Sequence, residues 1–253
     1  MGILQVFPKE EFFKTIDPKA YAPGQICHVI VPHLTKIPQI LDVERNRPEE
    51  HDNIKFTLRN AKPTGDFVAA DRTLPLFKIN LRTNEELLVQ RAKKRPGIIL
   101  PSFVNIYPEI TTLLSGRKEH LQDDALFVIP CYGIETRDNA KGFPPEMVER
   151  VRCLIYNQFF FLPAHKALTK DSIARFDRIQ VITDKKEKAA IEPTNLCLSD
   201  DVLNFFIAML LYCITGITDD DLAAIRQLTT EKYLGIQEGW SIKKPAAKKG
   251  NIS

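Results

Sequence analysis

The chain has 253 residues, of which 44% are hydrophobic and 26% charged. This composition predicts a folded protein with a full apolar core, built as one large domain or as one domain with insertions. The net charge of +3 is compatible with a nucleic-acid partner but does not argue for one, because dedicated electrostatic binders usually carry a larger basic excess.

Cysteine usage and apolar patterning predict a cytoplasmic protein without a metal or other cofactor. The odd number of cysteines and the lack of a signal peptide favour reduced thiols, and the absence of a Cys-X-X-Cys pair disfavours zinc. The longest apolar stretch, 202–217, is too short and too interrupted to span a bilayer, so no membrane association is expected. The five cysteines are Cys27, Cys131, Cys153, Cys197 and Cys213.

In chain order, a core strand is expected first over 26–31, entered from a Pro-Gly turn. The next segment, 34–92, is rich in charges and prolines and contains strand-like pieces at 54–58 and 76–81. A capping-box pattern predicts a helix over 83–92. We interpret 34–92 as an insertion within a single domain over 1–240, followed by a basic, disordered tail over 241–253.

The middle of the chain predicts further strands, and its C-terminal part predicts two helices. Ser199 as N-cap and Gly216 as terminator frame a helix to about 215, and a second helix is expected over 219–234. Because nearly every face of the first helix is apolar, it is expected to pack against the sheet or in a dimer interface. The other expected elements are strands at 97–100, 125–129, 153–162 and 179–182, and a short helix or irregular segment at 145–151.

The stretch 93–102 is the most informative part of the sequence. A basic run leads into Arg95-Pro96, and an apolar strand begins directly afterwards. Because proline fixes the backbone, Arg95 is expected at a rigid strand mouth, where a guanidinium can hold a phosphate through two parallel hydrogen bonds. The alternative is a solvated loop cation beside Lys93 and Lys94.

Several short motifs follow one another in a characteristic order. They are Pro23-Gly24-Gln25-Ile26, Lys94-Arg95-Pro96-Gly97-Ile98-Ile99-Leu100, Phe127-Val128-Ile129-Pro130-Cys131, Tyr156-Asn157-Gln158, Ser172 to Ile179 and a C-terminal helix. Together they resemble the MazF/PemK/Kid growth-inhibitor toxins. The similarity covers about 90 of the 253 residues, scattered along the chain.

The resemblance implies an α+β fold: a small, strongly curved, mainly antiparallel, barrel-like sheet with a long insertion after the first strand and C-terminal helices. It implies an endoribonuclease-like toxin that cleaves single-stranded RNA without a metal ion, by attack of a ribose 2′-hydroxyl on the adjacent phosphate. It also implies a homodimer, with an antitoxin protein as a possible partner.

The same resemblance assigns roles to individual residues. Arg95 matches the family's Arg-Pro arginine, Tyr132 takes the place of its threonine, and Asn157-Gln158 the place of its Asp-Gln pair. Thr136 is proposed as a third catalytic residue beside Arg95 and Tyr132, because it lies in the loop after a core strand. The residues expected to bind substrate are Lys94, Arg137, Asn157, Gln158 and His33.

Other interpretations remain open. The region around Thr136 also fits a plain polar turn, and His33 also fits an ordinary surface residue. The aromatic run 159–161 fits a base-stacking platform less well than core packing. A non-catalytic binding module on the same scaffold is the main alternative function, because the changes to Tyr132 and Asn157 reduce acid–base capacity. A topoisomerase poison of the related CcdB type is a third possibility.

Overall fold

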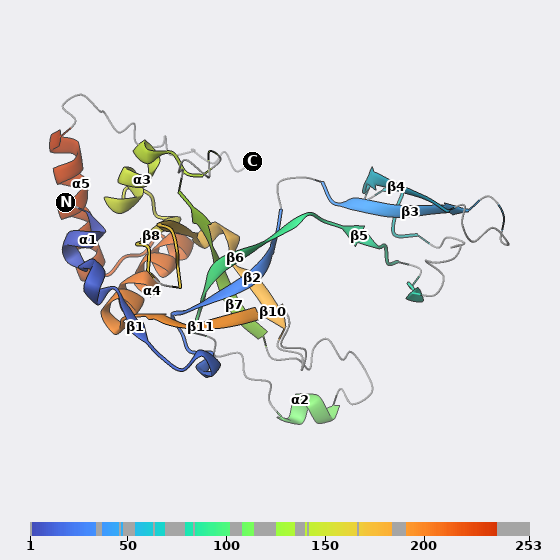
Figure 1. The fold of residues 1–253 in the computed structure, drawn as a ribbon, viewed down its shortest axis with the longest axis horizontal. Helices are drawn as coiled ribbons and strands as arrows, with labels where there is room; N and C mark the ends of the chain where they lie inside the picture. The colour runs from blue at the N-terminus through green and yellow to red at the C-terminus, as the bar shows by residue number, and fades with distance from the viewer. Residues whose placement is uncertain are drawn as a thin grey trace, which may run out of the picture. The chain divides into compact units, whose positions relative to one another are not determined.

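The computed structural model confirms the expected class: an α+β protein whose strands pair mainly antiparallel (Figure 1). The predicted basic tail, 241–253, lies outside the described residues and stays a prediction. The structure describes residues 2–33, 37–45, 47, 54–62, 64–68, 79–82, 84–101, 108–113, 125–134, 140, 142–165, 167–183 and 191–236.

The chain divides into two compact units. The first combines Met1–Val29 with Arg95–Ser253, and the second is Ile30–Lys94. The second unit therefore includes the whole of the segment 34–92 that the sequence analysis treats as an insertion. Strands β2 (Gln25–Pro32) and β6 (Ala92–Ile99), which lead into and out of it, each belong partly to both units.

The main sheet has eight strands in the order β1-β11-β2-β6-β7-β9-β8, with β10 beside β7. The pairings among the described residues leave β1 and β8 at opposite ends, so the sheet is open and does not close on itself. Its strands are β1 Phe13–Thr15, β2 Gln25–Pro32, β6 Ala92–Ile99, β7 Ala125–Gly133, β8 Phe159–Leu162, β9 Ser172–Arg175, β10 Gln180–Thr183 and β11 Ile191–Leu198.

The strands predicted at 26–31, 97–100, 125–129 and 179–182 are confirmed. The strand predicted over 153–162 is only partly right, because only the last four residues of that range, Phe159–Leu162, form a strand, β8. Leu154 has a φ of +57°, which ends the preceding helix and turns the chain before the strand begins. Strands β1, β3, β9 and β11 were not predicted, since their short or interrupted runs give little periodicity.

Within the described residues, five α-helices accompany the sheet; they confirm the two expected at 199–215 and 219–234, and 145–151, left open between a helix and an irregular segment, is helical. The longest apolar one, α4, ends at Gly216, whose φ of +72° suits glycine and whose N–H donates to the Tyr212 carbonyl at 2.9 Å. The helices are α1 Ile3–Val6, α2 Pro108–Leu113, α3 Pro145–Arg152, α4 Asp200–Thr215 and α5 Asp220–Ile236.

Helix α4 packs against the main core, which is one of the two environments expected from its composition; the dimer interface stays a prediction. Phe206 meets Phe160 of β8 with ring centroids 5.0 Å apart. The opposite side of the helix keeps Leu211 and Ile214 exposed. Within the described ranges, no single helix combines the length and the apolar character that crossing a bilayer requires. The buried residues of α4 are Val202, Phe205, Phe206, Met209 and Leu210.

The second unit contains a three-stranded sheet in the order β4-β3-β5. The strand predicted at 54–58 is confirmed, and 79–81, the described part of the piece predicted at 76–81, is not a strand. The helix predicted over 83–92 is wrong, because β5 pairs antiparallel with β3 and this non-local pairing overrides the local capping pattern. The strands are β3 Gln39–Arg45, β4 Ile54–Asn60 and β5 Leu88–Val89.

The Gly24-Gln25 pair that opens β2 has a structural role. Gly24 has a φ of +82° and approaches Leu203 so closely that a Cβ would lie 3.2 Å from that side chain. The Gln25 side chain is fully buried; its Nε2 donates to the carbonyls of Pro18 and Thr194, at 2.9 and 2.8 Å. Its Oε1 accepts from a backbone N–H at 2.8 Å. This amide therefore joins the loop before β2 to β11.

We expect Gln25→Ala to lower the free energy of unfolding by about 2–3 kcal/mol, because it leaves buried carbonyls without donors. Urea denaturation followed by circular dichroism measures the change. Gln227→Ala, on an exposed part of α5, is the matched control and should change stability by less than about 0.5 kcal/mol. Equal effects of the two substitutions would contradict the buried role of Gln25.

In the second unit, Arg59 bridges two carboxylates. Its guanidinium contacts Asp42 across the β3–β4 pair and contacts Asp66 at 2.7 Å. Asp66 also accepts from the backbone N–H of Lys62 at 2.6 Å. The Arg59 hydrogen bonds, with the Lys62 N–H, lower the pKa of Asp66 from 3.8 to about 2.

Because the folded-state pKa of Asp66 lies below its unfolded value, its contribution to stability is complete above about pH 4 and is lost as the pH falls toward 2. Hydrogen exchange of the β3 and β4 amides, corrected for intrinsic rates, should show protection falling across this window. Asp66→Asn should reduce protection above pH 4 and flatten the dependence. An unchanged pH profile in this variant would show that another group is responsible.

Candidate functional site

Side chains of one face of the main sheet form a row of aromatic rings and arginines. The register pairs Arg175 of β9 with Phe159 of β8, and Tyr132 of β7 with Ile173 of β9, so all four side chains share one face. We call this set of side chains the arginine–aromatic face and define it by Arg95, Tyr132, Phe159, Phe161 and Arg175. The aromatic run 159–161 is core material, as expected, since all three phenylalanines are buried.

Arg95 lies inside a strand, which corrects the expectation of a loop ending at a strand mouth. Strand β6 runs continuously through Arg95 and Pro96, and its pairing with β7 begins at Gly97 opposite Pro130. The ladder with β7 begins one residue after Pro96, whose nitrogen carries no hydrogen to donate to it. A Cβ at Gly97 would lie 2.6 Å from a methyl carbon of Val128, so neighbouring strands hold this part of β6 tightly.

The Arg95 guanidinium stacks on the ring of Tyr132, with its Cζ 4.5 Å from the ring centroid. Extending the register of β6 and β7 by two residues beyond the Gly97–Pro130 pair places the two side chains opposite each other. The Nε of Arg95 is buried and has no hydrogen-bond partner. Among the described residues no carboxylate pairs with this guanidinium. The Nε of Arg152 is also buried without a partner, but Arg152 has two carboxylates on its other nitrogens, so the lack of any described carboxylate is what makes Arg95 a candidate anion-binding group.

A second arginine approaches the same ring from the other side of β7. The Cζ of Arg175 lies 5.5 Å from the Tyr132 centroid and 5.6 Å from that of Phe159. Unlike Arg95, Arg175 has a carboxylate partner: its Nε donates to Asp177 at 3.0 Å and its Nη2 at 2.5 Å. Arg178 also reaches Asp177, at 3.6 Å.

The ion pair sets the charge state of both partners. Partial burial by itself would raise the pKa of Asp177, yet hydrogen bonds from Arg175 and the positive charges of Arg175 and Arg178 hold that pKa below its usual value. The same hydrogen bonds raise the pKa of Arg175. Asp177 is therefore ionised at neutral pH, and the face carries two full guanidinium charges with one carboxylate between Arg175 and Arg178.

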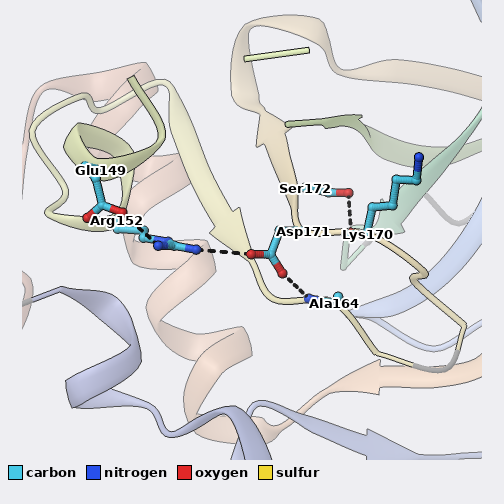
Figure 2. Close-up of polar contacts among 6 residues, drawn as sticks. All are labelled: Glu149, Arg152, Ala164, Lys170, Asp171 and Ser172. Atoms are coloured by element: carbon cyan, nitrogen blue, oxygen red, sulfur yellow. Dashed lines mark hydrogen bonds and ion pairs between the residues drawn. The ribbon is translucent and has the colours of Figure 1, made fainter. Parts of the chain in front are cut away.

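Figure 2 shows the polar network that fixes the neighbouring end of the face. Arg152 of α3 stacks on Phe161 with its Cζ 4.4 Å from the centroid, and it donates to Glu149 at 2.8 Å and to Asp171 at 3.1 Å. Asp171 also accepts from the backbone N–H of Ala164 at 2.7 Å. The network ties α3 to both ends of the β8–β9 connection, so it positions the strands that carry Phe159 and Arg175.

We expect Asp171→Asn to destabilise the protein by about 1–2 kcal/mol. Asparagine keeps one acceptor oxygen for the Ala164 N–H, but it presents an NH2 group, which is a donor, to the Arg152 guanidinium. Thermal unfolding measures the change. Lys170→Ala is the control, since Lys170 is exposed and only its carbonyl is used, by Ser172. If both variants unfold like the wild type, the network in Figure 2 does not hold the β8–β9 connection.

Of the catalytic candidates, Arg95 and Tyr132 lie in direct contact, whereas Thr136 lies outside the described residues and stays a prediction. The substrate-binding candidate Arg137 also lies outside them. Asn157 and Gln158 occupy the turn before β8, and no described contact joins their side chains to Arg95. The remaining candidates, Lys94 and His33, are exposed and belong to the second unit.

Sequence reasoning missed Arg175 and Asp177, although both lie in the Ser172–Ile179 segment that contributes to the resemblance. Arg175 is the last residue of an unpredicted strand, and Asp177 lies in the short 3-10 helix that follows. A signal was present in the sequence Arg-Phe-Asp-Arg, where a core phenylalanine separates charges of opposite sign. Only the register of β9 against β7 brings these charges to Tyr132.

Other chemistry-bearing side chains of the described part do not gather into a site. No group of three histidine, cysteine, aspartate or glutamate side chains there could hold a metal ion. The five cysteines are free. Burial raises the pKa of Cys27 to about 12 and also raises that of Cys131, so both thiols are protonated at neutral pH.

Comparison with known proteins gives one distant relative. The chain is 33% identical over 115 residues to the Rho GTPase-activating protein gacC of Dictyostelium discoideum. The alignment covers 45% of this chain but only 28% of that protein. No known family model matches the chain, and no solved structure matches it.

Proposed function

We propose that this chain binds single-stranded RNA at the arginine–aromatic face and cleaves it without a metal ion. The observation that carries the proposal is the Arg95 guanidinium, which stacks on Tyr132 and keeps a buried Nε–H without an acceptor. A phosphate oxygen supplies such an acceptor, and a phosphate matches the fork geometry of the guanidinium. Arg175, on the other side of the same ring, adds positive charge.

In the proposed reaction, the ribose 2′-oxygen attacks the adjacent phosphorus and its proton leaves to a base. The bond from phosphorus to the 5′-oxygen breaks, and that oxygen takes a proton. The products are a 2′,3′-cyclic phosphate end and a 5′-hydroxyl end. Arg95 stabilises the negative charge that develops on the non-bridging oxygens, and the Tyr132 hydroxyl is the proposed proton donor to the leaving oxygen.

The finer fold assignment belongs to the same proposal. The order of motifs along the chain supports a MazF/PemK-type scaffold with an enlarged first loop. The resemblance expects a carboxylate at position 157, where this chain has Asn157; Asp177 supplies a carboxylate at the face instead, through its contact with Arg175. Pairing of two copies, a neutralising antitoxin and a cytoplasmic location stay predictions.

A second candidate function is RNA binding without cleavage. The observation that favours it is the ion pairing of Asp177 with Arg175 and Arg178, which lowers the pKa of this carboxyl and so weakens it as a proton acceptor. A tyrosine in place of the family's threonine points in the same direction, because its hydroxyl stands on a longer and more rigid arm.

The two functions are separated by incubating the purified protein with single-stranded RNA. We expect fragments with 2′,3′-cyclic phosphate ends, and we expect Arg95→Ala to slow their formation by roughly 100-fold or more because charge stabilisation is lost. Arg226→Ala is the matched control. Arg226 belongs to α5 and not to the arginine–aromatic face, but its Cζ also lies over a tyrosine ring, 4.3 Å from the Tyr212 centroid.

Circular dichroism should show that the Arg95 variant keeps the wild-type fold. Binding without fragments would favour the non-catalytic module. Full cleavage by Arg95→Ala, or neither binding nor cleavage by the wild type, would remove the proposal.

A further inference from the structure

The two arginines of the face are close enough to contact one nucleic acid strand together. Both guanidinium carbons are measured from the same Tyr132 centroid, at 4.5 Å for Arg95 and 5.5 Å for Arg175. The separation of the two carbons therefore cannot exceed 10.0 Å. They come from β6 and β9, the strands on either side of β7, so the sheet itself sets their spacing.

The two guanidiniums differ in one respect, which is the presence of a carboxylate. Asp177 takes the Nε and Nη2 hydrogens of Arg175 with its two oxygens, in the geometry that a phosphate would use. The Asp177 side chain is 38% exposed, and it lies two residues from Arg175 in a short 3-10 helix. Such a partly exposed, local ion pair stabilises the fold little and can be exchanged for another anion.

Phe176 lies between Arg175 and Asp177 in the sequence. It is buried in the core, where its ring centroid lies 5.1 Å from that of Phe206. It holds the backbone in place, so an exchange of partners at Arg175 needs only side-chain rotation. Arg152 offers a useful contrast. Its carboxylate, Asp171, accepts from the backbone N–H of Ala164, seven residues away, and is less exposed than Asp177, so that pair links separate parts of the fold.

We propose that Arg175 is a second phosphate-contacting residue of the site, and that Asp177 is an internal counter-ion which a substrate phosphate replaces. This inference rests on the proposed function and gives it a substrate class: a single strand that presents neighbouring phosphodiesters to Arg95 and Arg175, with a base or sugar near the Tyr132 ring. A mononucleotide fills only one of the two positions and binds more weakly than an oligonucleotide.

The test is the salt dependence of binding, measured by fluorescence anisotropy with an all-2′-deoxy oligonucleotide that the proposed reaction cannot cleave. For single strands, the slope of log K against log salt changes by about 0.7 for each phosphate contact. We expect Arg175→Gln to make the slope shallower by about 0.7 and to weaken binding. Glutamine keeps much of the side chain packed on Phe159, and thermal unfolding checks that the fold is intact.

Asp177→Asn should tighten binding by roughly two- to fivefold, because the competing anion is removed. Arg226→Ala, the control, should change neither slope nor affinity. If Arg95→Ala weakens binding while Arg175→Gln matches the wild type, the second contact is refuted and the proposed function stands. Weaker binding by Asp177→Asn would equally refute the counter-ion role. If the wild-type protein binds neither this oligonucleotide nor RNA, both proposals fall.

Discussion

The phenyl ring of Phe160 lies between strand β8 and helix α4, where it contacts Phe205 and Phe206. It also contacts Phe12 and Phe176, and its side chain is completely buried. Because strand side chains alternate, this one contact fixes which face of β8 points toward α4. Phe159 and Phe161 must then point to the other face, toward the arginines. A shift by one residue would exchange the two sets, at the cost of the core.

The arginines stacked on the arginine–aromatic face illustrate how partners decide the role of a side chain. Arg152 has two carboxylate partners, which link α3 to the β8–β9 connection. Arg95 has a similar stacking contact and, like Arg152, a buried Nε without a partner, but it has no carboxylate partner among the described residues. Arg175 stands between these cases, with one partly exposed carboxylate. The contacts of Arg152 are accounted for by their contribution to stability. Those of Arg95 are not, which is why Arg95 is the better candidate for ligand binding.

The positive character of the site comes from placement and not from overall charge. The first unit contains 23 lysines and arginines and 23 aspartates and glutamates, whereas the second contains 12 and 9. A neutral unit can still present a cationic face if its arginines converge there while its acids are distributed elsewhere. Composition therefore gave no indication of this face.

The sequence by itself determined the class of fold, most core strands and the limits of α4. It also singled out Arg95 as a candidate residue, although it placed Arg95 in a loop and not inside β6. These features depend on local signals: apolar runs, proline and glycine positions, and helix caps. Only the tertiary structure decided that β5 replaces the predicted helix and that Gln25 joins β2 to β11. The same holds for the approach of Arg175, which Asp177 partners, to the ring of Tyr132. Strand pairing brings together residues that are dozens of positions apart, and no local pattern encodes which strands pair or in which register.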